Sequence, residues 1–177
     1  EAHDIVFSRT GISKMAQEDT FSPGTMAEKR LIHANMKDTL LLDRYRNLRT
    51  KLLSTSNKHN FITLVTSVVN DDNACMVAAN LAATFSLDEA KTSTLIEAEI
   101  HNPKLNQVFD MNEKSGLIDY LESEDWLGDQ VLCKTGIPRL RYVPSGLPRE
   151  NSAEYFTSNK MKAFVDELVE RERTKAD

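Results

Sequence analysis

The sequence predicts an α/β fold in three layers, with helices on both faces of a mostly parallel β-sheet. Three runs rich in β-branched and aliphatic residues, at positions 61–66, 92–96 and 140–143, predict strands. Stretches with helical spacing of apolar residues separate them, and strands that alternate with helices are typical of parallel βαβ units. A chain of 177 residues is long enough to bury the core that such a fold requires.

The N-terminal residues 1–28 predict a tail or linker. They mix polar residues with isolated apolar ones and end in Ser22-Pro-Gly24, which is a turn signal. We therefore expect the folded domain to occupy residues 29–177.

The residues from Lys29 to Ser54 predict helix, with a break near positions 33–38. One face is expected to pack on the core, because apolar residues recur on it at spacings of four, three and four. Its members are Leu41, Tyr45, Leu48 and Leu52. A neighbouring face carries Asp43, Arg46 and Arg49, whose plain interpretation is a solvated helix surface.

Residues 61–86 have the frame of a phosphate-binding loop but lack the residues that hold phosphate. A P-loop is G-x-x-x-x-G-K-[ST] between a strand and a helix, and here a helix is expected from Cys75 to Ser86. Positions 68–75 contain neither glycine nor lysine, and Ala74 and Cys75 stand at the lysine and hydroxyl positions. The loop residues that we single out are Asn70, Asp71, Asp72, Asn73, Ala74 and Cys75.

Two adjacent carboxylates make this loop unfavourable for a polyphosphate. The N-terminus of a helix favours anions, but Asp71 and Asp72 would occupy that field themselves. We interpret positions 68–75 as a turn that keeps the strand-to-helix geometry, and we expect no cofactor. The alternative is residual binding of ATP through backbone N–H groups, with Mg²⁺ as its companion ion.

Acidic residues follow the strand at 92–96 at alternate positions. Glu97, Glu99 and His101 would share one face if the strand continued through them, and they could then ligate a metal. The alternative, which we favour, is a surface loop closed by Pro103. We therefore expect neither a metal site nor a catalytic residue in this segment.

The remaining segments complete the alternating pattern. Short helices are expected at 104–110 and 117–121, and an extended piece is expected at 131–133. Residues 158–175 predict an amphipathic helix. Its apolar face comprises Met161, Phe164, Val165, Leu168 and Val169.

Individual reactive or anchoring side chains have plainer interpretations. Cys75 could be a reactive thiol at a helix start, but the neighbouring aspartates oppose the thiolate, so a small buried residue is the better interpretation. Cys133 lies in an apolar run and is expected in the core. Trp126 is either an anchor for a partner or a partly buried loop aromatic, and the second case is the commoner.

Composition and charge argue against several classes of protein. The net charge of -5 argues against nucleic acid as a partner, because neutralising phosphates requires a basic surface. No apolar run approaches the ~20 residues of a membrane span, and no signal peptide is visible. Two cysteines make no disulfide framework, so the cytoplasm is the expected compartment.

The order of these segments resembles the cytoplasmic domain of bacterial tyrosine kinases of capsule and exopolysaccharide export, within the MinD/ParA-like P-loop group. Motifs in the same order carry the resemblance. They are Asp43-Arg-Tyr-Arg-Asn-Leu-Arg49, Val65-Thr-Ser67 with Ala79-Asn-Leu-Ala82, Leu95-Ile-Glu-Ala-Glu-Ile-His-Asn-Pro103, Gly116-Leu-Ile-Asp-Tyr-Leu121, Val143-Pro-Ser-Gly146 and Ser152-Ala-Glu154. The resemblance implies a P-loop NTPase-like fold.

The resemblance implies an oligomerisation role for Asp43, Arg46 and Arg49, which correspond to the family's E-x-x-R-x-x-R segment with an aspartate for the glutamate. It also places Glu97 and Glu99 where the family's second acidic motif has aspartates. Magnesium demands near-ideal octahedral geometry, so a longer carboxylate is not a neutral replacement.

The family's Walker B strand would begin just after the last residue of this sequence. We therefore expect the kinase-like domain at 29–177 to be incomplete at its C-terminal end. The tyrosine-rich tail that these kinases phosphorylate is likewise missing from the sequence.

The resemblance and the altered loop together predict a non-catalytic, pseudokinase-like scaffold or regulator of exopolysaccharide or capsule synthesis and export. We expect a homo-oligomer that works in the cytoplasm, at the inner membrane through a membrane chain-length or co-polymerase protein. One alternative is an active ATP-dependent tyrosine kinase or ATPase with an atypical P-loop. Another is a MinD/ParA-like positioning ATPase, against which the segment Asp43–Arg49 speaks.

Overall fold

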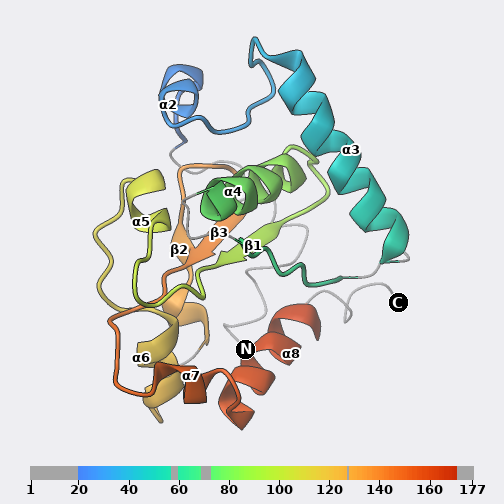
Figure 1. The fold of residues 1–177 in the computed structure, drawn as a ribbon. Coiled ribbons are helices and arrows are strands. Elements are labelled where there is room, and N and C mark those ends of the chain that lie inside the picture. The colour runs from blue at the N-terminus through green and yellow to red at the C-terminus, as the bar shows by residue number, and fades with distance from the viewer. Residues whose placement is uncertain (1–19, 57–59, 69–72, 127, 171–177) are drawn as a thin grey trace. The chain divides into compact units, whose positions relative to one another are not determined.

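A computed structural model describes residues 20–56, 60–68, 73–126 and 128–170 (Figure 1). The chain divides into two compact units. Of the described residues, the first unit holds those up to Ser93 together with residues 135–140, and the second holds those between 94 and 134 and those from Arg141 to 170. The boundary that we place between residues 28 and 29 stays a prediction.

The first helix among the described residues is α2, Pro23–Glu28, which lies inside the range expected as a tail. The Ser22 hydroxyl caps the helix by accepting a hydrogen bond from the Thr25 N–H at 3.1 Å, and proline occupies the first turn. Met26 is buried. A loop then leads to α3, Thr39–Thr55, so the expected break near 33–38 is confirmed, but the helix expected at 29–32 is wrong.

The buried face of α3 agrees only in part with the one that we predicted, in which Tyr45 and Leu52 are half-buried. Leu42 is 3% exposed, whereas Leu41 and Leu48 are each 38% exposed. Three consecutive leucines follow Thr39 at the start of this helix, so apolar spacing alone does not decide which of them is buried. The inner side of α3 also carries Arg49, whose guanidinium donates to the Thr84 carbonyl of the next helix in the chain at 2.7 Å.

Helix α4, Asn73–Ser86, confirms the helix expected from Cys75 to Ser86. Ala79 and Ala83 are fully buried, so their small side chains allow close approach of the neighbouring elements. The buried Asn80 amide fixes the loop before α3, since it accepts from the Ile32 N–H at 2.7 Å and donates to the Arg30 carbonyl at 3.1 Å.

The strand predicted at 61–66 is wrong for the structure, which has no strand there. The Phe61 ring contacts Phe85 of α4 with a centroid distance of 5.8 Å. Ile62 and Leu64 are 64% and 83% exposed. No backbone hydrogen bond joins residues 61–66 to another described residue. A strand needs a paired neighbour, so β-propensity alone does not produce one here.

A small sheet lies mostly in the second unit, in the order β1-β3-β2. These strands are β1, Ser93–Ile96, β2, Cys133–Lys134, and β3, Leu140–Val143. The Ser93 N–H donates to the Arg139 carbonyl and the Glu97 N–H to the Val143 carbonyl, so residue numbers rise together and this pair is parallel. β2 pairs with β3 in the antiparallel sense. The described sheet is therefore mixed rather than mostly parallel.

The described part of the second unit also contains several helices. They are α5, Leu105–Val108, α6, Leu117–Glu122, the 3₁₀ helix η2, Gly128–Val131, α7, Ser152–Tyr155, and α8, Asn159–Glu170. The helices expected at 104–110, 117–121 and 158–175 are confirmed, apart from positions 171–175, which lie outside the described residues. Of the extended piece expected at 131–133, only Cys133 is in a strand.

The core of the second unit forms between α6, η2, β3 and α8. Phe164 of α8 is buried against Tyr120 of α6, with ring centroids 5.1 Å apart. Met161, Leu168 and Trp126 pack against this core while remaining partly exposed. Trp126 is thus a partly buried aromatic, as expected. No helix of the described residues is long and apolar enough to cross a membrane.

Candidate functional site

The acidic segment after β1 is the candidate site in the second unit. Glu97 follows the last residue of β1, and its N–H donates to the Val143 carbonyl at 3.0 Å. The backbone therefore keeps the strand register for one further residue. Its side chain is 4% exposed, which differs from the surface loop that we expected at this position.

Both carboxylate oxygens of Glu97 accept hydrogen bonds from within the second unit. Oε1 accepts from the N–H groups of Lys104 at 2.7 Å and Leu105 at 2.9 Å. Oε2 accepts from the Tyr142 hydroxyl at 2.5 Å, a distance typical of charge-assisted O–H···O⁻ bonds. One side chain thus connects the end of β1, the start of α5 and the middle of β3.

The phenol of Tyr142 is a neutral donor in this arrangement. The residue is fully buried, and its ring lies 5.4 Å from that of Phe109. Burial raises the pKa of Tyr142 far above its usual range, and the hydrogen bond to Glu97 and the charge of that carboxylate raise it further. The hydroxyl therefore keeps its proton and donates a hydrogen bond to Glu97.

Glu99 and His101 lie apart from the buried carboxylate. Both are exposed, and Glu99 Oε1 closes its own turn by accepting from the N–H groups of His101 at 2.9 Å and Asn102 at 3.2 Å. The structure does not gather Glu97, Glu99 and His101 at one exposed site. Among the residues that the structure describes, no group of three His, Cys, Asp or Glu side chains could hold a metal ion.

Arg149 holds the loop after β3 against α6, a feature that we did not predict. Its Nη2 donates to Asp119 Oδ1 at 2.8 Å and its Nε to Glu122 Oε2 at 3.1 Å. The hydrogen bond to Glu122 and the two carboxylate charges raise the pKa of Arg149. Asp119 Oδ2 also accepts from the Gly116 N–H at 2.9 Å. The three-residue spacing of Gly116 and Asp119 at a helix start was the signal available in the sequence.

Gly146 lets this loop approach α6 closely. Its φ of +84° is in the left-handed region, and a Cβ there would lie 2.4 Å from Asp119 Oδ2. Arg149 and Gly146 together fix the segment that follows β3.

The structure separates the three charged residues predicted for oligomerisation. Asp43 and Arg46 are exposed on α3, and their Oδ1 and Nη1 atoms lie 3.5 Å apart. Arg49 instead donates to the Thr84 carbonyl in the last turn of α4. Their role in oligomerisation stays a prediction.

The predicted loop at 68–75 is described only in part. Asn70, Asp71 and Asp72 lie outside the described residues. Asn73, Ala74 and Cys75 form the first turn of α4, where Ala74 and Cys75 are half-buried. Neither cysteine is part of a disulfide, and Cys133 is also half-buried rather than fully in the core. The expectation that this loop binds no nucleotide stays a prediction.

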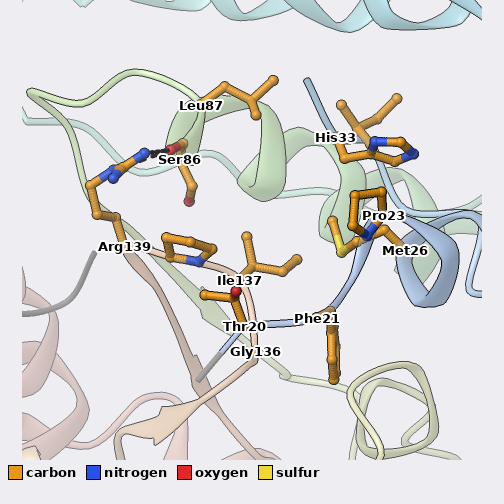
Figure 2. Close-up of a pocket in the computed structure, with 12 residues that line it drawn as sticks. Thr20, Phe21, Pro23, Met26, His33, Ser86, Leu87, Gly136, Ile137 and Arg139 are labelled. Carbon is orange, nitrogen blue, oxygen red and sulfur yellow. Dashed lines mark hydrogen bonds between the residues drawn. The ribbon is translucent and has the colours of Figure 1, made fainter. Parts of the chain in front are cut away.

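A cavity of about 170 Å³ lies within the first unit (Figure 2). Figure 2 shows apolar side chains around it, including Phe21, Met26 and Ile137. Arg139 directs its guanidinium to the Ser86 carbonyl, with Nη2 at 2.7 Å and Nε at 3.2 Å. Ligand pockets usually measure about 300–1,000 Å³, so this niche suits an apolar side chain better than a nucleotide.

Comparison with curated proteins finds bacterial tyrosine kinases, although no protein-family model matches the sequence. The chain is 27% identical over 146 residues to the tyrosine-protein kinase CpsD of Streptococcus agalactiae. The match covers 82% of this chain and 61% of CpsD, so the chain spans about three fifths of that relative. It is also 26% identical over 137 residues to the putative tyrosine-protein kinase EpsB of Ralstonia nicotianae, covering 77% of this chain and 18% of EpsB.

Comparison with solved structures supports the fold. The kinase domain of the Escherichia coli tyrosine kinase ETK matches with a TM-score of 0.68 and 20% identity, over 85% of this chain and 63% of that one. The VpsO kinase domain matches with a TM-score of 0.62 and 18% identity, over 76% of this chain and 64% of that one. The relatives of this chain are thus bacterial tyrosine-protein kinases, and its fold is like that of their kinase domains.

Proposed function

We propose that this chain is a non-catalytic, kinase-like scaffold or regulator of exopolysaccharide or capsule synthesis and export. The observation that supports it most is a mismatch between fold and loop. The fold is like that of tyrosine kinase domains, whereas positions 68–75 hold no glycine and no lysine, and a cysteine replaces the hydroxyl that binds Mg²⁺. Phosphoryl transfer depends on positioned charges, so this loop lacks the means of catalysis.

The proposal includes a finer account of the fold. β1 and β3 form the parallel pair of a larger, mostly parallel sheet with helices on both faces, as in P-loop NTPases. The small antiparallel strand β2 is then an edge addition to that sheet. Neither ATP nor Mg²⁺ is required for the fold to serve as a scaffold.

The partners that we propose are further copies of the chain and a membrane chain-length or co-polymerase protein. Helix α3 is the contact element, because Asp43 and Arg46 present accessible charges on it. Arg49 supports the same helix from within, through its hydrogen bond to the Thr84 carbonyl. The chain would act in the cytoplasm and reach the inner membrane through that partner, without binding nucleic acid.

Tyrosine autophosphorylation tests the proposed function. The purified full-length gene product, incubated with ATP and Mg²⁺, is expected to gain no phosphotyrosine by mass spectrometry. CpsD, treated identically, is the positive control for the assay. Phosphotyrosine on this protein would contradict the proposal in favour of an active kinase with an atypical loop.

A further inference from the structure

The fold of tyrosine kinase domains implies a bound Mg²⁺, and the resemblance assigns its acidic motif to Glu97 and Glu99. The structure allows a direct test of whether Glu97 suits that ion. Its carboxylate already accepts hydrogen bonds from the backbone N–H groups of Lys104 and Leu105 and from the Tyr142 hydroxyl. A carboxylate has about four lone-pair sites, so three of them are occupied.

We propose that Glu97 is a structural carboxylate that fastens the end of β1 to α5 and β3, and that it does not bind a divalent cation. Burying an ionised carboxylate is costly unless hydrogen bonds compensate for the lost hydration. Two backbone donors and one hydroxyl supply that compensation here. Removing Glu97 would leave these three donors without an acceptor.

The surroundings of Glu97 oppose a magnesium ion for a second reason. Mg²⁺ binds oxygen at about 2.0–2.1 Å and usually keeps several of its waters. Glu97 is 4% exposed, and the buried Tyr142 occupies the side of Oε2. A hydrated ion could reach the carboxylate only by displacing these partners, so the residue does not fit the ion that the fold family implies.

The side chain of Glu97 is longer than that of the aspartate in the family's motif, and its length matters for the role that we propose. The family's motif has an aspartate at this position, and glutamate adds one methylene. If Glu97 served a cation, the variant Glu97→Asp would preserve or improve binding. Since we infer that Glu97 serves three internal donors instead, the shorter side chain would reach them less well and would destabilise the protein.

Thermal unfolding with and without millimolar MgCl₂ or MnCl₂ tests the inference. The variants are Glu97→Asp, Glu97→Gln and Tyr142→Phe, with Glu99→Gln as the matched control because Glu99 is exposed. We expect Glu97→Gln and Glu97→Asp to lower the Tm by on the order of 5–10 °C, and Tyr142→Phe by about 2–5 °C. Glu99→Gln should change it little, and neither salt should shift the Tm of any variant.

Two outcomes would overturn the inference. One is a cation-dependent rise in the Tm of the natural protein that is lost in Glu97→Gln but kept in Glu99→Gln. The other is an unchanged Tm in both Glu97 variants. If those variants do not fold, Tyr142→Phe tests the inference instead, because it removes one donor to Glu97 and keeps the ring. An unchanged Tm in Tyr142→Phe would then overturn the inference. The inference does not depend on the proposed function: phosphotyrosine without any Glu97-dependent cation effect would refute the scaffold and leave this inference standing.

Discussion

At the scale of residues, hydrogen bonds between distant positions decide what the charged side chains do. The partners of Glu97 include Tyr142, 45 positions away, and those of Arg149 include Asp119, 30 positions away. Periodicity in a sequence reports which face a residue occupies, but it carries no information on such pairs. The alternate spacing of Glu97, Glu99 and His101 therefore suggested a shared face that the structure does not form.

The buried phenol of Tyr142 gives a pH-dependence with a definite sign. Its pKa is raised in the folded protein, whereas an unfolded tyrosine ionises near pH 10. The stabilisation is therefore complete below about pH 10 and is lost as the pH rises above it, because only the unfolded chain releases the proton. In urea titrations, Tyr142→Phe should reduce the decline of the unfolding free energy by about 1.4 kcal/mol per pH unit in this range. Identical slopes for both proteins would contradict this assignment.

Substituting Arg149 should loosen the segment after β3 without unfolding the rest of the protein. Because its side chain pins the segment after β3 to Asp119 and Glu122, Arg149→Ala should increase amide hydrogen exchange several-fold at positions 145–151. Arg149→Lys should restore the protection only in part, since lysine cannot reach two carboxylates with a planar fork. Unchanged exchange in Arg149→Ala would show that the loop is held by other contacts.

At the scale of elements, local sequence patterns predicted some helices and strands correctly and failed for one predicted strand. Helix α4 and strands β1 and β3 were predictable, because a run rich in alanine favours a helix and short runs rich in β-branched, aliphatic and aromatic residues favour strands. The residues 61–66 carry an equally strong β signal, yet a strand also needs a paired neighbour, which no stretch of sequence guarantees locally.

The face of α3 can be tested by a pair of adjacent leucines. Leu42→Ala should lower the free energy of unfolding by about 2–5 kcal/mol, because it leaves a cavity in a packed site. Leu41→Ala should cost less than about 1 kcal/mol, because that side chain is 38% exposed. Urea denaturation measures both. A larger cost for Leu41→Ala than for Leu42→Ala would mean that the helix packs on the face that the sequence alone suggested.

The charged residues on α3 should differ in role. Asp43 and Arg46 should contribute to oligomerisation, and Arg49 should contribute to the stability of the fold. Arg46→Glu is expected to reduce the oligomer mass in light scattering without lowering the Tm, because an exposed ion pair contributes at most about 1 kcal/mol. Arg49→Ala is expected to lower the Tm, because it removes the donor to the Thr84 carbonyl. Lys51→Ala, an exposed cation elsewhere on the helix, is the control and should change neither quantity. Loss of oligomer in all three variants would contradict a specific role for Arg46.

At the scale of the whole molecule, the sequence predicted the family likeness better than the details of the sheet. Short motifs in a fixed order survive substitution, so the resemblance to bacterial tyrosine kinases could be seen at 27% identity to CpsD. The described sheet is smaller and mixed, because β2 adds an antiparallel neighbour and residues 61–66 join no strand. The loss of catalysis, by contrast, rests on the loop sequence and remains a proposal.

The most direct test of that proposal is a calorimetric titration of ATP with Mg²⁺ into the full-length gene product, with CpsD as the positive control. We predict no heat of binding for this protein, because its loop at 68–75 has no lysine for the phosphates and no hydroxyl for the cation. Saturable binding in the micromolar range would contradict the account and would mean that the loop holds nucleotide through its backbone.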